Sequence, residues 1–192
     1  RSPVVKMLAA ATVTPRSGEI LRQAAIDASV DPVTRASALT ALSTATGTGA
    51  LERAIDGFSS LPVAAPDLPA PLDSVWRQFV SAGAHAPSVQ TFRDLTTSKE
   101  PARQILGYSV LLQLAAEPVA TGRGARGGGG GRGGRGGPSA AAIESARALA
   151  RKDIDAAWQG PSVASLLRAI GATEATGYAE RVQPFLTGAS PD

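Results

Sequence analysis

The 192-residue sequence contains no cysteine, a single histidine and few aromatic residues, which make up 4% of the chain. Without cysteine it cannot form a disulfide, a thiolate nucleophile, a cysteine-ligated zinc site or a covalent haem attachment. The scarcity of aromatic side chains disfavours a β-sandwich, because strands favour β-branched and aromatic residues. Alanine and leucine supply much of the 43% apolar content, which predicts a mostly helical chain.

The chain also lacks a long apolar run and begins at Arg1, with neither an initiator methionine nor a signal peptide. We therefore expect a piece of a larger protein that has no membrane span in this part. Its length suits one domain of ordinary size or a short helical solenoid.

Glycine and positive charge are concentrated in one segment. Residues 122–137 (GRGARGGGGGRGGRGG) contain eleven of the 21 glycines and four arginines. Removing these four charges from the net charge of +3 leaves −1 for the rest of the chain. We expect residues 121–138 to be a flexible, disordered Gly/Arg-rich insert. It would separate helical repeats over 1–120 from C-terminal helices over 139–188 that complete the same fold.

The insert allows a nucleic-acid hypothesis. Its three Arg-Gly-Gly triplets could contact RNA through guanidinium charge and stacking, and the candidate contacts are Arg123, Arg126, Arg132 and Arg135. Without interleaved aromatic residues such binding would be weak and salt-sensitive, so a tolerated loop insertion is the preferred interpretation. Residues 122–127 also match GxGxxG, but the preceding strand and following helix of a nucleotide loop are missing from the pattern.

Apolar spacing predicts helices over most of the remaining chain. The expected segments are 4–13, 18–29, 32–46, 51–61, 75–80, 89–95, 101–114, 139–158, 163–170 and 173–186. The expected N-caps are Ser17, Asp31, Ser98, Ser139 and Thr173, and Gly47 and Gly171 are the expected ends of two helices. Residues 62–71 contain four prolines and are predicted to be a loop.

The apolar patterns also predict how each helix is buried. The helix over 101–114 has almost no polar face, which predicts a central, buried position. In the other helices one apolar stripe should face inward, and these stripes include Ile20, Leu21, Leu149, Ile154, Tyr178, Val182, Phe185 and Leu186.

Residues with catalytic or metal-binding chemistry are scattered. His85 is alone in a predicted loop, with no cysteine or second histidine to complete a metal site. Ser109 lies inside the most apolar helix and outside any GxSxG motif. Asp73, Asp94 and Glu100 could meet in a cleft, but their spacing does not require it. We predict no catalytic, cofactor-binding or metal-binding residues, and a chain that is not itself an enzyme.

The run DPVTRASALTAL (31–42) resembles the helix-turn-helix of HEAT repeats. The resemblance implies an all-α, HEAT-like α-solenoid of antiparallel helix pairs. It also implies that Asp31 caps the helix that begins at Pro32, and that Arg35 reaches a neighbouring repeat. Arg103 occupies a similar position, after a proline in the first turn of a helix and before an apolar run.

The tail AAWQGPSVASLLRAIGATEATGYAERVQPFL (156–186) resembles the helical-repeat section of large exported bacterial proteins. In these proteins a β-propeller dehydrogenase domain precedes the repeats and a c-type cytochrome domain follows them. The resemblance implies a periplasmic or exported scaffold or spacer that contacts neighbouring domains of its own polypeptide or another protein. Haem would belong to a neighbouring domain, because this chain has no CxxCH motif and binds no cofactor itself.

Overall fold

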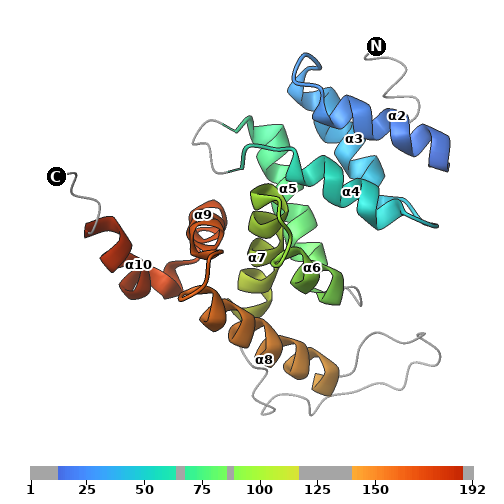
Figure 1. The fold of residues 1–192 in the computed structure, drawn as a ribbon. Helices are drawn as coiled ribbons and strands as arrows, with labels where there is room; N and C mark the ends of the chain where they lie inside the picture. The colour runs from blue at the N-terminus through green and yellow to red at the C-terminus, as the bar shows by residue number, and fades with distance from the viewer. Residues whose placement is uncertain (1–12, 64–67, 86–88, 117–139, 188–192) are drawn as a thin grey trace, which may run out of the picture.

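The computed structural model describes residues 13–63, 68–85, 89–116 and 140–187, and within these ranges the chain forms helices and no strand (Figure 1). The α-helices are α2 (Pro15–Ile26), α3 (Pro32–Thr44), α4 (Ala50–Ser59), α5 (Ala70–Ala84), α6 (Val89–Leu95), α7 (Pro101–Ala116), α8 (Ala140–Ala157), α9 (Val163–Thr173) and α10 (Ala179–Thr187), with a 3-10 turn η1 (Thr176–Tyr178) before the last. The all-α prediction is confirmed. The predicted insert at 121–138, the Ser139 cap and nearly all of the predicted 4–13 helix lie outside the described residues.

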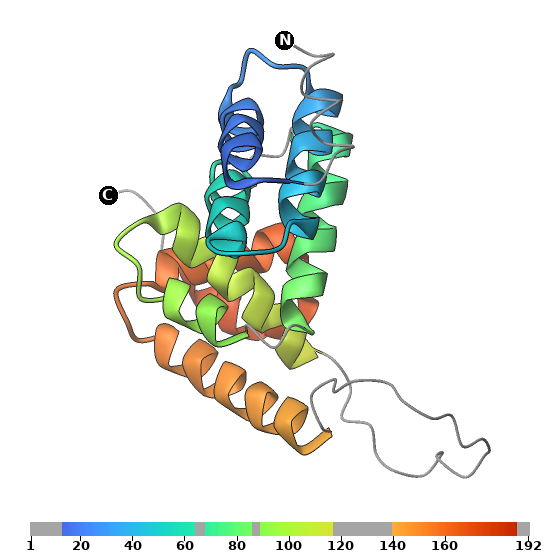
Figure 2. The same cartoon turned by 90° about the vertical axis from the view of Figure 1, so that its right-hand side faces the viewer.

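Most helices two apart in the chain lie side by side. α2 packs against α4, α3 against α5, α5 against α7, α6 against α8, and α7 against α9. Among consecutive helices, α2–α3, α3–α4, α6–α7 and α7–α8 contact each other extensively. The contacts of α5–α6 and α8–α9 are slight, and α4 and α5 have no substantial contact. Figure 2 shows the result, with α2 and α3 at one end of an elongated stack and α8 at the other. None of the helices in the described part is long and apolar enough to cross a membrane.

Helix α2 starts earlier than the predicted helix over 18–29. Its N-cap is Thr14, whose hydroxyl accepts a hydrogen bond from the Ser17 amide at 3.2 Å, while the Ser17 hydroxyl accepts one from the Thr14 amide at 2.8 Å. Ser17 is therefore the third-residue partner in a capping box rather than the cap itself. Pro15 occupies the first helical position, where the missing N–H removes no intrahelical bond.

Two further boundaries correct the predictions. The proline-rich segment ends earlier than expected, since α5 already begins at Ala70 and holds Pro71 in its first turn, where proline is tolerated. α9 continues through Gly171 to Thr173, and the chain turns at Glu174, which has a φ of 53°. Thr173 thus ends α9 instead of capping the last helix, and its hydroxyl donates back to the Ala169 carbonyl.

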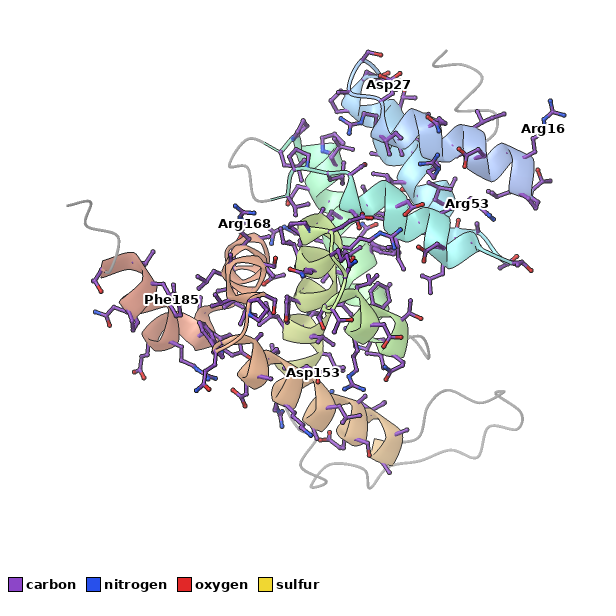
Figure 3. All side chains as sticks on the ribbon, in the orientation of Figure 1. Arg16, Asp27, Arg53, Asp153, Arg168 and Phe185 are labelled. Carbon is purple, nitrogen blue, oxygen red and sulfur yellow. The ribbon has the colours of Figure 1, made fainter. Side chains whose placement is uncertain are left out.

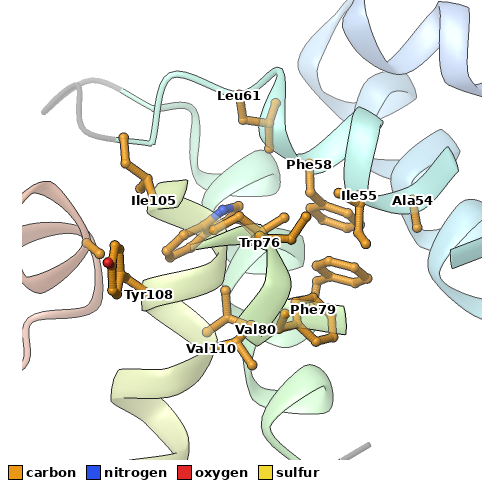
Figure 4. Packing of buried hydrophobic residues seen from close by; sticks show 14 of the residues in the cluster. Ala54, Ile55, Phe58, Leu61, Trp76, Phe79, Val80, Ile105, Tyr108 and Val110 are labelled. Atoms are coloured by element: carbon orange, nitrogen blue, oxygen red, sulfur yellow. The ribbon is translucent and has the colours of Figure 1, made fainter. Parts of the chain in front are cut away.

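The core is organised around α7, which contacts α4, α5, α6, α8 and α9. The prediction of a central, buried helix over 101–114 is confirmed. Beside it, the rings of Phe58 and Phe79 stack with centroids 4.0 Å apart (Figure 4). Phe92 meets Phe79 edge-on at 5.9 Å. Gly107 lets α7 approach α6 closely, because a Cβ there would lie 2.7 Å from the Phe92 carbonyl oxygen.

Several apolar side chains predicted to face inward are exposed. Ile20, Leu149, Phe185 and Leu186 are all among the exposed large hydrophobic residues of the described chain. The last two belong to α10, which has no buried residue and whose main helical contact is the short turn η1. Tyr178 and Val182, predicted to face inward as well, are partly buried against the core, whereas Phe185 and Leu186 of the same stripe remain exposed. An apolar stripe becomes core only where another element covers it.

Candidate functional site

The turn between α2 and α3 has the local geometry that its sequence predicts. The Asp31 side chain accepts a hydrogen bond from the Thr34 amide at 2.9 Å, and Pro32 takes the first helical position. Such a cap satisfies one of the free amides at the start of a helix. Asp31 and Pro32 therefore fix where α3 begins.

Arg35 makes a different contact from the one that the resemblance implies. Its Nε donates to the Ala25 carbonyl at 2.9 Å, and Ala25 lies in the last turn of α2, the other helix of the same pair. The guanidinium supplies a donor and a positive charge to the end of α2, where helix carbonyls lack intrahelical partners. Arg35 therefore contacts its own helix pair and not, as the resemblance had implied, a neighbouring repeat.

Arg103 makes the kind of contact with a distant helix that was expected of Arg35. From the first turn of α7 its Nη2 contacts Glu52 at 2.8 Å and also donates to Asp56, and both carboxylates lie on α4. Its Nε lies 3.4 Å from Glu100. The Arg103 side chain is 22% exposed, so this ion cluster joins two helices that are far apart in the sequence in a partly shielded place.

Two further arginines bridge distant helices, and sequence reasoning missed both. Arg93 of α6 binds Asp153 of α8 through two hydrogen bonds of 2.6 and 3.1 Å, and this bonding raises the pKa of Arg93. Figure 3 marks Asp153 on α8. Arg77 of α5 pairs with Asp73 on its own helix and with Glu174 after α9. No local pattern marks these pairs, because their members lie 60 and 97 residues apart.

The contact between α7 and α9 includes two polar pairs inside an apolar surface. The Tyr108 hydroxyl lies 2.7 Å from the Ser162 hydroxyl, and the Ser165 hydroxyl donates to Gln104 at 2.6 Å. Because partners in a partly buried place must be aligned to hydrogen-bond, these pairs restrict sliding of one helix along the other.

Residues with catalytic potential have ordinary structural contacts. His85 Nδ1 lies 2.8 Å from the Ser81 carbonyl, and the buried Ser109 hydroxyl donates to the Ile105 carbonyl. Each carboxylate of the possible cleft is engaged by a neighbour: Asp73 by Arg77, Asp94 by Gln90 and Glu100 by Arg103. Within the described ranges no group of three or more potential ligands could hold a metal ion.

The end of the stack that carries α10 has an aromatic cluster. The Trp158 ring lies 5.8 Å from Phe185 and 6.3 Å from Tyr178, and the Arg181 guanidinium lies 4.8 Å from the Trp158 ring centre. Phe185 is nevertheless 41% exposed and its neighbour Leu186 is 73% exposed. We call Trp158, Phe185 and Leu186 the end surface.

No family model, curated protein or solved structure matches this chain. Its function is therefore argued from its own residues. Of the predicted site residues, Asp31, Pro32, Arg35 and Arg103 are in the described part, whereas Arg123, Arg126, Arg132 and Arg135 lie outside it.

Proposed function

We propose that this chain is a non-catalytic helical-repeat scaffold that spaces and contacts other domains. The pairs α2/α3, α4/α5, α6/α7 and α8/α9 would be the units of a HEAT-like solenoid. In a solenoid each unit covers the apolar face of the next, so the array acts as a spacer whose ends and sides remain free for partners.

The packing of alternate helices supports the repeat arrangement. α3, α5, α7 and α9 each lie against the next member of this series, which is how the second helices of stacked pairs would pack. The other row is interrupted, because α4 contacts α2 and α7 but has no substantial contact with α6, and α4 packs little against α5.

Ion pairs between the proposed units support a spacing role. Arg103 joins the second and third pairs through α4, Arg93 joins the third and fourth through Asp153, and Arg77 joins the second to the residue after α9. Directional contacts of this kind favour one relative orientation of the pairs over others. A spacer needs that property, since it holds its neighbours at fixed distances.

The observation that carries the proposal is the end surface. Phe185 and Leu186 expose apolar area at the last helix of the stack, next to the partly covered ring of Trp158. An exposed aromatic and aliphatic group of this kind is typical of a protein contact. The resemblance of 156–186 to the repeat section of exported propeller and cytochrome proteins suggests a neighbouring domain of an exported redox protein as the partner.

A photo-crosslinking experiment tests the scaffold proposal. p-Benzoylphenylalanine is placed at Phe185 in the full-length polypeptide, and at Leu149 of α8 as the control, since both side chains are 41% exposed. We expect position 185 to crosslink to one discrete peptide of another domain or partner, and position 149 to give no discrete product. Equal and diffuse crosslinking from both positions would contradict the proposal.

The nucleic-acid alternative depends on the four arginines of the Gly/Arg segment and has its own test. Under the scaffold proposal, single-stranded RNA should bind no more tightly than a nonspecific level of about 10⁻⁴–10⁻⁶ M at physiological salt. Fluorescence anisotropy would measure this affinity. Submicromolar binding that disappears when Arg123, Arg126, Arg132 and Arg135 are replaced would favour the alternative.

A further inference from the structure

A cavity of about 400 Å³ lies where the end of α4, the middle of α5 and the first turns of α7 meet. Its wall is mostly apolar and includes Phe58, Leu61, Val63, Trp76 and Ile105. Figure 4 shows the Trp76 indole between Ile105 and Phe58, with its nitrogen on the side of Leu61. The volume is in the usual range for small-molecule sites, about 300–1,000 Å³.

Two polar groups in this apolar wall have no partner. Trp76 is only 2% exposed, and neither its Nε1 nor the Ser59 hydroxyl has a hydrogen-bond partner in the described structure. A buried donor left without an acceptor is unfavourable by about 1–3 kcal/mol, so an acceptor that arrives with a ligand would relieve a defect in the empty site. The preference created by the indole is for an acceptor, since an indole nitrogen can only donate.

One arginine side chain and the start of one helix also border this cavity. Arg168 of α9, labelled in Figure 3, lines it with an exposed side chain. No described residue forms an ion pair or hydrogen bond with that side chain. The first turn of α7 contributes Pro101 and Ala102, and the amides of a first helical turn lack intrahelical partners and favour anions. None of the described lining residues carries a carboxylate.

We infer that this cavity binds a small monocarboxylate with an apolar body, such as an arylalkanoate. The apolar body would pack against Phe58, Leu61 and Ile105, and the carboxylate would lie between Arg168 and the Ala102 amide. The Trp76 ring forms part of the same wall, so its N–H signal would report occupancy of the cavity. This site is independent of the scaffold proposal, because it lies away from the end surface.

Titration with 4-phenylbutyrate, followed by two-dimensional ¹H–¹⁵N NMR, tests this inference. The chain has two tryptophans and so two indole N–H signals, and a Trp158→Phe variant assigns the Trp76 signal. The uncharged 4-phenylbutyramide is the matched probe. We expect the carboxylate to shift the Trp76 signal saturably, and the amide to bind at least about fivefold more weakly because it lacks the charge-assisted contacts.

Variants locate the site. Arg168→Gln should weaken binding of the carboxylate about three- to tenfold, whereas Arg16→Gln, which changes the net charge equally on exposed α2, should not. Ala102→Leu places bulk into the cavity from an exposed position and should abolish binding while the other NMR signals stay in place. Equal binding of acid and amide, an unmoved Trp76 signal, or equal effects of Arg168→Gln and Arg16→Gln would overturn the inference.

Discussion

α7 and α10 are both helices with apolar side chains at helical spacing, yet they differ completely in burial. Nine residues of α7 are buried, and none of α10 is. α7 touches five other helices, whereas the main helical contact of α10 is the short turn η1. The comparison shows that an apolar face specifies what a helix is able to bury. The helices around it determine how much of that face leaves water.

The largest expected effect comes from truncating one leucine in each helix. Leu111 in α7 is fully buried, so Leu111→Ala should lower the free energy of unfolding by about 2–5 kcal/mol through lost burial and a residual cavity. Leu186→Ala in α10 should change it by less than about 0.5 kcal/mol, because that side chain is already 73% exposed. Urea denaturation measures both values. Similar losses for the two variants would mean that α10 is covered in solution.

Glycine-to-alanine substitutions extend the comparison to one closely packed and one open glycine. In Gly107→Ala the new Cβ would meet the Phe92 carbonyl oxygen at 2.7 Å and the Thr96 nitrogen at 3.1 Å, so α6 and α7 would have to separate. We expect a loss of about 1–3 kcal/mol. At Gly171, near the end of α9, an added Cβ would have no neighbouring atom within 4 Å, and Gly171→Ala should stabilise the protein by about 0.5–1 kcal/mol. Thermal melts that showed the same sign for both would refute this account.

The contrast also explains what the sequence could and could not predict. The central position of α7 followed from its nearly continuous apolar surface, from Ile105 to Leu114, which leaves no face for water. The exposure of Phe185 and Leu186 did not follow, because their spacing is the same as that of a buried stripe. Periodicity reports a face, but it carries no information on which element covers that face.

The same limit applies to the contacts that join the helices. The Asp31 cap was predictable because a cap depends on three or four adjacent residues. The partners of Arg103 were not, since Glu52 and Asp56 are remote in the sequence and become neighbours only when α4 and α7 pack. Even local rules compete, as Thr14 and Ser17 show: both are good N-caps, and Pro15 at the first helical position favours Thr14.

Substitution of Arg103 measures how much its ion pairs between α7 and α4 contribute to stability. Arg103→Gln removes the charge that joins α7 to two carboxylates of α4, and should destabilise the protein by about 1–2 kcal/mol, since the cluster is partly shielded from water. Arg16→Gln, at an exposed position without such partners on α2, is the control and should change stability by less than about 0.5 kcal/mol. If 1 M salt removed no part of the difference, the ion cluster would not be its source.

Substitutions of Asp31 measure how much the N-cap of α3 contributes to stability, at the end of the stack opposite α10. Asp31→Ala removes the acceptor for the Thr34 amide and should lower the free energy of unfolding by about 0.5–2 kcal/mol, with the helical circular-dichroism signal of the native state retained. Asp31→Asn keeps an acceptor of nearly the same shape and should restore most of the loss. Equal destabilisation by both variants would show that the cap contributes little and that charge at this position matters instead.

The smallest effect is expected on the solvent face of α2. Glu19 accepts hydrogen bonds from Arg22 at 2.6 and 2.9 Å, and from Gln23 at 3.0 Å, and these contacts lower its pKa from 4.5 to about 2. Glu19→Gln should therefore lower stability at neutral pH by only about 0.3–0.5 kcal/mol, because the Glu19 side chain is 52% exposed and its ion pair is screened. Glu180→Gln on α10 is the matched control, at an exposed position without a side-chain partner among the described residues.

The pH dependence of this difference identifies its cause. A carboxylate whose pKa is lower in the folded protein than in the unfolded chain stabilises the fold at every pH above the unfolded value of 4.5. The contribution declines as the pH falls from 4.5 and is lost at about 2, where the folded carboxyl is protonated as well. Urea midpoints of the wild type and Glu19→Gln should thus be separated at pH 7 and converge toward pH 2. A separation that stayed constant over this range would assign the effect to helix propensity rather than to the Arg22 contact.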